Sequence, residues 1–256
     1  MEFNDCSIVL RLGGFRESDL WVHLLSPSRG VFSAFAFGGS KSRRRFSGCL
    51  DLFNEVRFHI KSGRGSYLAL QEGVLLKGPS RLRHDWRRLG VAANCALFVE
   101  SFCKGPEGAE KTHALFADLL NCLETDAPIS AFLPMFFRAR LAFEQGYALD
   151  PDFCSFCGAS LADSHAHRPG QKNPTVLPVN AQGLLCGGCA GKIRADVRRF
   201  PLGRGGLAIL RALIRTPVSA WGRMPEDENS QKECAMATEA FLQYNIGSAA
   251  GKFLRN

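Results

Sequence analysis

The sequence predicts an α+β protein with several small domains: a five-stranded β-barrel, a mainly α-helical domain and a small module held by four cysteines. Three observations predict this class. Short apolar runs bounded by turn residues fill the first part of the chain, the apolar period then becomes helical, and two Cys-x-x-Cys pairs follow. We expect a barrel over residues 1–80, a helical domain over 81–150, the cysteine module over 151–200 and terminal helices over 201–256 that pack on the helical domain.

The N-terminal part contains five apolar or alternating runs, separated by glycine pairs or polar turns. They cover residues 7–12, 20–25, 31–37, 52–60 and 67–76. Alternation of apolar and polar side chains is typical of half-buried strands. Five strands in about eighty residues is the size of a small closed barrel, for which the oligonucleotide-binding (OB) fold is the first candidate. An SH3-like barrel is the alternative.

After Pro79 the apolar residues recur at helical spacing, which predicts three helices before residue 150. The first predicted helix has one stripe of residues along its face: Leu82, Trp86, Leu89, Ala93, Leu97 and Glu100. The second carries the stripe Phe116, Leu119, Leu120 and Leu123. In the third, Ser130 is the expected N-cap and the stripe Phe132, Phe136 and Phe137 is expected in the core of a bundle.

Three further helical segments are expected in the C-terminal part of the chain. They cover residues 190–199, 202–215 and 226–245. The last is expected to present Cys234, Ala237, Phe241 and Tyr244 on one face.

Two cysteine pairs, Cys154-Ser155-Phe156-Cys157 and Cys186-Gly187-Gly188-Cys189, are separated by twenty-eight residues. Two intervening residues let a tight turn direct both thiolates of a pair toward one ion, and Zn²⁺ favours closed four-ligand structural sites. Gly158, Gly187 and Gly188 are expected to supply the unusual backbone angles of such turns. We therefore predict a structural Zn²⁺ bound by Cys154, Cys157, Cys186 and Cys189. A disulfide pair, redox-active dithiols or a chance spacing are the alternatives.

A catalytic role for this metal is not expected. His165 and His167 lie in the spacer and are interpreted as part of a solvated loop, and the signature of nucleobase deaminases is absent from the sequence. Glu144 and Asp152 are the acids considered as partners of such a metal, and Asp152 is expected to be a solvated turn residue. The phosphate-loop motif is also absent, so we expect neither ATP hydrolysis nor another enzymatic activity.

The charge balance indicates a polyanionic partner. Thirty-two lysines and arginines against 24 acids give a net charge of +8, and the pI is about 9.1. Six further cysteines stand in apolar surroundings without the spacing of a disulfide framework, which is typical of reduced cytoplasmic proteins. No apolar run approaches membrane-helix length and no secretory leader is recognised, so no membrane partner is expected.

Two basic clusters are the predicted DNA contacts. The first lies between the third and fourth predicted strands and contains Lys41, Arg43, Arg44 and Arg45. Phe46 follows directly, and its ring is expected to be exposed for stacking on bases. The second begins the first helix and contains Arg81, Arg83, Arg87 and Arg88. A weaker third cluster contains Lys192, Arg194, Arg198, Arg199 and Arg204. Phe15, Trp21 and Phe35 are further stacking candidates, with Trp21 and Phe35 equally compatible with the core.

Several of these segments together resemble one known family. The matching segments are Gly14-Phe15-Arg16-Glu17-Ser18-Asp19, residues 37–43, Gly183-Leu184-Leu185-Cys186 and residues 241–247. In this order and over nearly the whole chain they resemble the bacterial recombination mediator family RecO.

The resemblance implies an N-terminal OB-fold, a helical domain and a zinc knuckle. It further implies binding to single- and double-stranded DNA, annealing of complementary strands and indirect assistance to RecA, together with RecR and single-stranded DNA-binding protein. The sequence does not identify the surface that meets the acidic tail of the latter; helices over 112–124 and 130–146, with Arg138 or Arg140 as the cation beside an apolar groove, are one candidate. A zinc-dependent nucleic-acid-modifying enzyme and an RNA-binding zinc protein are the alternatives.

Overall fold

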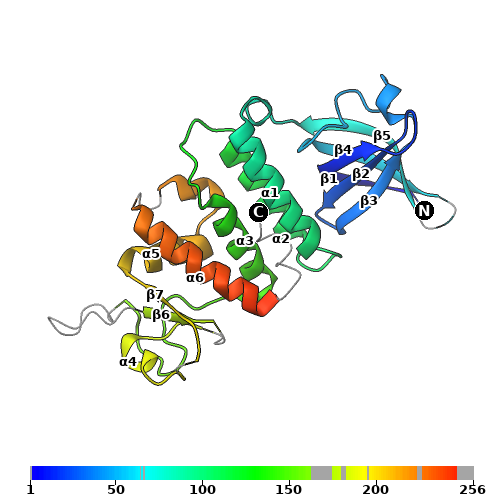
Figure 1. Cartoon of the computed structure of the whole chain (residues 1–256). Coiled ribbons are helices and arrows are strands. Elements are labelled where there is room, and N and C mark those ends of the chain that lie inside the picture. Colours follow the sequence, from blue (N-terminus) through cyan, green and yellow to red (C-terminus); the bar gives the residue numbers. More distant parts are fainter. Residues whose placement is uncertain are drawn as a thin grey trace. The chain divides into compact units, whose positions relative to one another are not determined.

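Five strands close into a barrel at the N-terminal end of the chain (Figure 1). They are β1 (Glu2–Gly14), β2 (Leu20–Ser26), β3 (Gly30–Ala36), β4 (Glu55–Ser62) and β5 (Leu68–Lys77). Their order around the barrel is β1-β2-β3-β5-β4, with only β3 and β5 running parallel. This computed structural model describes residues 2–63, 65, 67–162, 175–179, 183–194, 196–223 and 227–246. The predicted five-stranded OB-like barrel is confirmed.

The long strand β1 closes the barrel by pairing on both of its edges. Residues 2–8 pair with β4, and residues 8–14 pair with β2. The register shifts between Val9 and Arg11, which marks a β-bulge, and such bulges bend a strand and increase its twist. Alternate side chains then point inward and form an apolar core that includes Val9, Val22, Leu24, Val56, Phe58 and Ile60.

Two helices, α1 (Trp86–Phe102) and α2 (Ala109–Leu123), belong to the same compact unit as the barrel, Met1–Ala127. The Asp85 carboxylate caps α1 by accepting hydrogen bonds from the backbone N–H groups of Arg87 and Arg88. This cap starts α1 at Trp86, after a separate 3₁₀ turn at Leu82–His84. Leu82 therefore does not set the buried face of α1, and Trp86, expected on that stripe, is 76% exposed.

In the described part of a second compact unit, Pro128–Asn256, there are three longer helices. They are α3 (Leu133–Ala142), α5 (Arg204–Arg215) and α6 (Glu228–Ile246), and a π-helical turn (Phe143–Tyr147) extends α3. Phe136 and Phe137 are buried, as predicted. The expectation for Ser130 is wrong, because α3 starts at Leu133 with Phe132 at the N-cap position, and the Ser130 hydroxyl accepts the N–H of Phe132 in the turn before the helix. The four-part division of the chain stays a prediction.

The cysteine module lies in this second unit. It contains the two-stranded sheet β6 (Thr175–Pro178) and β7 (Arg199–Leu202), and the single helical turn α4 (Gly187–Ala190). The expected helix over residues 190–199 is wrong, because the chain leaves α4 through turns and Arg199 then begins a strand paired with β6. Pairing with a distant segment has overridden the local helical pattern.

The last helix, α6, buries Cys234, Ala237 and Phe241 as expected. The expectation for Tyr244 is wrong, because its ring is 59% exposed. Thr238 and Leu242 are buried in addition, so the buried face is centred away from Tyr244, which lies at its edge. No helix in the described residues is both long and apolar enough to cross a membrane.

Candidate metal centre and nucleic-acid interface

The four predicted metal ligands come together. The Sγ atoms of Cys154, Cys157, Cys186 and Cys189 all lie within 4.8 Å of one another. The sulfur atoms of Cys157 and Cys186 are 3.8 Å apart. Four sulfurs at about 2.3 Å from one tetrahedral ion would be separated by roughly 3.8 Å. The cluster therefore has the donor set and the dimensions of a closed metal site.

Backbone hydrogen bonds shape each cysteine turn. In the first, the N–H of Gly158 donates to the Cys154 carbonyl at 2.9 Å, and Gly158 has a left-handed φ of 70°, which a residue with a Cβ rarely adopts. In the second, the N–H groups of Cys189 and Ala190 both donate to the Cys186 carbonyl at 3.0 Å. The expectation for Gly187 and Gly188 is wrong, because both lie in the α4 turn with negative φ.

Their surroundings shift the pKa values of two of the four thiols. Burial raises the pKa of the Cys154 thiol. Hydrogen bonds from the backbone N–H groups of Cys186, Cys157 and Phe156 outweigh the effect of burial and lower this pKa to about 6. Burial, reinforced by the neighbouring thiols, raises the pKa of Cys189 to about 12. Four thiolates would repel one another in this space, and a divalent cation offsets that repulsion.

Glu144 and Asp152, two of the acids near the cysteines in sequence, are engaged by arginines. Asp152 Oδ1 accepts a hydrogen bond from Arg211 Nε at 3.0 Å, and Asp152 Oδ2 pairs with Arg215. Asp152 lies in a bend and is partly exposed, as expected of a turn residue, but its carboxylate is held by two arginines. Glu144 accepts from Arg140 Nε at 2.7 Å. His165 and His167 lie outside the described residues.

The basic loop (residues 38–45) is tied to the loop between β1 and β2. The backbone N–H of Gly38 donates to Asp19 Oδ1 at 2.7 Å, and the N–H of Ser40 donates to the Ser18 carbonyl at 3.1 Å. Lys41 Nζ forms an ion pair with Glu17 at 2.8 Å. The cationic side chains therefore stand on an anchored backbone.

The cations of the basic loop differ in how they are engaged. Arg45 Nη2 donates to the Phe37 carbonyl at 2.5 Å, so this guanidinium also holds the loop together. Arg43 and Arg44 are exposed, and within the described part of the chain neither has an ion-pair partner. The expectation of an exposed Phe46 is wrong: its ring is only 3% exposed, because the loop folds back and buries it in the barrel core, where it cannot stack on a base.

Most of the second basic cluster is engaged in holding the fold. Arg81 pairs with Asp126, and Arg83 pairs with Asp51 at 3.2 Å. Arg88 is largely buried and donates to the carbonyl of Leu123, the last residue of α2, and to that of Thr125 just beyond the helix. Only Arg87 is both exposed and without a described carboxylate partner, its guanidinium lying 5.3 Å from the centre of the Trp86 ring.

The expectation for Arg138 and Arg140 as surface cations is not supported by their surroundings. Arg138 is buried, with its Nη2 3.8 Å from Glu239 Oε2. Arg140 donates through Nη1 to the carbonyls of Leu213 and Thr216, at 2.7 and 2.9 Å. Both guanidinium groups are committed to contacts within the second unit.

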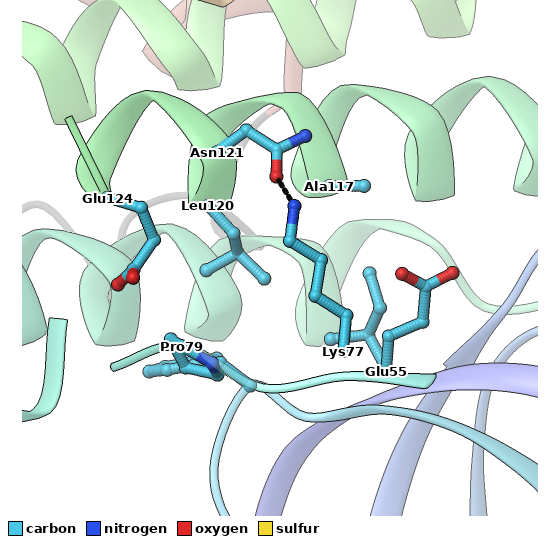
Figure 2. Close-up of a pocket in the computed structure, with 9 residues that line it drawn as sticks. Glu55, Lys77, Pro79, Ala117, Leu120, Asn121 and Glu124 are labelled. Carbon is cyan, nitrogen blue, oxygen red and sulfur yellow. Dashed lines mark hydrogen bonds between the residues drawn. The ribbon is translucent and has the colours of Figure 1, made fainter. Parts of the chain in front are cut away.

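Figure 2 shows a cavity where Lys77 extends past Leu120 to hydrogen-bond Asn121, between the carboxylates of Glu55 and Glu124. Its volume of about 50 Å³ is enough for a few water molecules and too small for a nucleotide. Glu124 is also occupied, since it accepts the backbone N–H of Leu82 at 2.7 Å. We interpret this cavity as structural.

Sequence reasoning missed two exposed rings, Phe37 and Tyr67. They meet Phe15 and Phe35 in one cluster on the barrel. The odd-numbered alternation of Phe35 and Phe37 placed them on one face, but nothing local indicated that Tyr67 would join them.

Two family models together match almost the whole chain. "Recombination protein O N terminal" matches residues 1–78 and "Recombination protein O C terminal" matches residues 83–252. A protein of Oleidesulfovibrio alaskensis, "DNA repair protein RecO", is 43% identical over 100% of both chains. Proteins with the same name from Nitratidesulfovibrio vulgaris and Anaeromyxobacter dehalogenans are 44% and 31% identical, over 96% of this chain and 96% and 93% of theirs.

Proposed function

This chain belongs to the RecO family of DNA repair and recombination proteins, and from that premise we propose that it is a non-enzymatic mediator that binds DNA and anneals complementary strands. The observation that carries the proposal is the pair Arg43 and Arg44, exposed on an anchored loop of an OB-like barrel. Cations in such a position neutralise phosphates of any sequence, as annealing requires. The net charge of +8 supports the same reading.

The proposed partners are single- and double-stranded DNA, RecR, single-stranded DNA-binding protein and, indirectly, RecA. Family membership supports the protein partners, and the cytoplasm is the proposed compartment. The structure gives these protein partners less support than family membership does. Arg138 and Arg140, the candidate contacts for the acidic tail, are engaged within the second unit.

We also propose that the four cysteines hold a structural Zn²⁺. All four are sulfur donors, and four protein ligands leave no open position for a reacting water. Two acids that precede the cysteines, Glu144 and Asp152, are paired with arginines, and the Asp150 carboxylate accepts the backbone N–H groups of Asp152 and Phe153, which weighs against a metal-assisted hydrolysis. In this proposal the ion shapes the module, and the cysteine ligands take no part in chemistry.

Annealing of complementary strands coated with single-stranded DNA-binding protein tests the function directly. The wild-type chain should accelerate annealing, and R43A/R44A should slow it. The same double variant should lower the slope of log affinity against log salt by about 1.4 on single strands and about 1.8 on duplex DNA, if both side chains contact phosphates.

R57A/K104A is the matched control, because it removes two exposed cations from the same compact unit. It should leave the annealing rate nearly unchanged. A folded R43A/R44A protein with a wild-type salt slope and annealing rate would place the DNA site elsewhere, with Arg87 the next candidate. RNA bound more tightly than either form of DNA would instead favour the RNA-binding alternative.

A further inference from the structure

The outer surface of the barrel carries an exposed cluster of four aromatic rings, here called the aromatic patch: Phe15, Phe35, Phe37 and Tyr67. The rings of Phe15 and Phe35 are 5.1 Å apart, and those of Phe37 and Tyr67 are 5.9 Å apart. Phe35 connects them, at 6.1 Å from Phe37 and 6.2 Å from Tyr67. Phe15 is 50% exposed, and Phe37 and Tyr67 are each 38% exposed, so the patch offers ring faces and edges to solvent.

Sheet geometry explains why these rings point outward. Ala34 and Ala36 are fully buried in the barrel, so the alternating residue Phe35 points to the outer face. Trp21 lies directly opposite Phe35 on β2 and shares that face. The patch thus lies on β3 and receives rings from two loops, the one after β1 and the one before β5.

The loop before β5 is built to bring Tyr67 into the patch. The backbone N–H of Gly63 donates to the Tyr67 carbonyl at 2.8 Å, which closes the turn. The Tyr67 ring lies directly over Gly63, where an added Cβ would come within 2.1 Å of the ring. A larger residue at this position would therefore displace the Tyr67 ring from where it lies.

Cations surround the aromatic patch. The Arg16 guanidinium lies 5.3 Å from the centre of the Phe15 ring, and Arg45 donates to the carbonyl of Phe37. The basic loop with Arg43 and Arg44 begins directly after Phe37. The acids of the neighbouring loop, Glu17 and Asp19, are engaged by Lys41 and by the Gly38 N–H. An apolar surface framed in this way matches a ligand that combines flat rings with negative charge.

We propose that the aromatic patch stacks unpaired bases of a single strand while the basic loop holds its phosphates. This inference rests on the DNA-binding function proposed above and assigns the base contacts within it. Aromatic side chains stack on any base, because every base has a π-face, so the patch retains strands without reading their sequence. The patch can stack only on unpaired bases, since the bases of a duplex already stack on one another. A single strand is thereby held with its base-pairing edges open to a complementary strand.

Binding of equal-length oligo-dT, abasic and duplex DNA by F37A/Y67A tests the inference. Affinity for oligo-dT should fall at least about fivefold for each lost stacking contact. Affinity for the abasic strand and for the duplex should change by less than about twofold, and the salt slope on all three should stay as in the wild type, because no phosphate contact is removed. V74A, which trims an exposed apolar side chain on β5 of the same barrel, is the matched control.

Two further variants separate stacking from apolar area and from folding. F37L/Y67L keeps apolar side chains without π-faces and should bind oligo-dT as weakly as F37A/Y67A, whereas F37Y/Y67F keeps both rings and should bind like the wild type. F15A removes a ring from the other loop and should weaken oligo-dT binding by itself, so a misplaced 63–67 turn cannot account for the whole effect.

Three results would overturn the inference. The first is wild-type affinity of F37L/Y67L for oligo-dT, and the second is an equal loss of affinity of F37A/Y67A for abasic and natural strands. The third is unchanged DNA binding by F37A/Y67A combined with slower annealing of protein-coated strands, which would make the patch a protein-docking face. Absence of single-strand binding by the wild-type chain would instead refute the underlying function. The two failures are therefore distinguishable.

Discussion

Arg88 shows how a side chain in a basic cluster can belong to the fold. Its Nη1 donates to the carbonyls of Leu123 and Thr125, at 2.9 and 2.8 Å, and its Nη2 donates to the carbonyl of Ala127 at 3.0 Å. The carbonyl of Leu123, the last residue of α2, has no partner within the helix, so Arg88 satisfies this group together with two carbonyls of the loop that follows. The Asp85 carboxylate, 3.1 Å from Arg88 Nε, fixes the guanidinium in this position.

Replacing Arg88 by Ala should therefore destabilise the protein, by about 2–4 kcal/mol, since several charge-assisted hydrogen bonds are lost together. Urea unfolding of the full chain measures this loss. The neighbouring R87A is the control, because Arg87 is exposed and its removal should change the free energy of unfolding by less than about 0.5 kcal/mol. Equal stabilities of the two variants would show that the contacts of Arg88 at the end of α2 contribute nothing.

At the scale of elements, the packing of α3 against α6 places Arg138 beside Glu239. Both side chains are largely buried, and Glu239 Oε2 has no hydrogen-bond partner among the described residues. Burial raises the pKa of the Glu239 carboxyl, and the Arg138 guanidinium only partly counteracts it. The carboxyl therefore keeps its proton to a higher pH in the folded protein than in the unfolded chain.

This difference predicts the sign of one pH dependence. Above the unfolded pKa near 4.5, the folded protein binds more protons at Glu239 than the unfolded chain does. The contribution of Glu239 to stability is therefore lost as the pH rises from that value through the folded pKa. Urea unfolding at several pH values should show this decline for the wild type and a flatter profile for E239Q. E228Q, at the exposed start of α6, should keep the wild-type profile. Parallel profiles for wild type and E239Q would contradict the prediction.

At the scale of the whole molecule, the chain forms two compact units, and all four cysteine ligands belong to Pro128–Asn256. Ion binding should stabilise that unit, because structural zinc contributes directly to folding free energy. We expect one zinc per chain by elemental analysis, and chelation should accelerate amide exchange in β6, β7 and the cysteine turns. Amides of the barrel strands should exchange as before.

C154S and C186S should reproduce this pattern without chelator, and C6S, which changes a cysteine on β1, should keep both the zinc and the exchange profile of the wild type. Zinc retained at wild-type stoichiometry by C154S and C186S would rule out the four-cysteine site. Faster exchange throughout the barrel on chelation would show instead that the two units are energetically coupled.

Much of the fold followed from local patterns along the chain. Alternation along β2 and β3, and the buried stripe of α2, are periodicities set by the geometry of a strand or a helix. The cysteine cluster was equally predictable, since two residues between ligands suffice to direct a pair of thiolates at one ion. The cationic character of the basic loop was likewise evident from four charges in five positions.

What each cation or ring does depended on residues far away along the chain. Phe46 is buried because its loop folds back over the barrel core, and Arg88 is engaged because the end of α2, 35 residues later, reaches its guanidinium. The sequence alone determined a cationic OB-like barrel and a four-cysteine module, because spacing and composition are properties of neighbours. Tertiary structure alone decided that Arg43 and Arg44 remain exposed and that Tyr67 meets Phe37 across the sheet, because burial and ion pairing depend on contacts between distant segments.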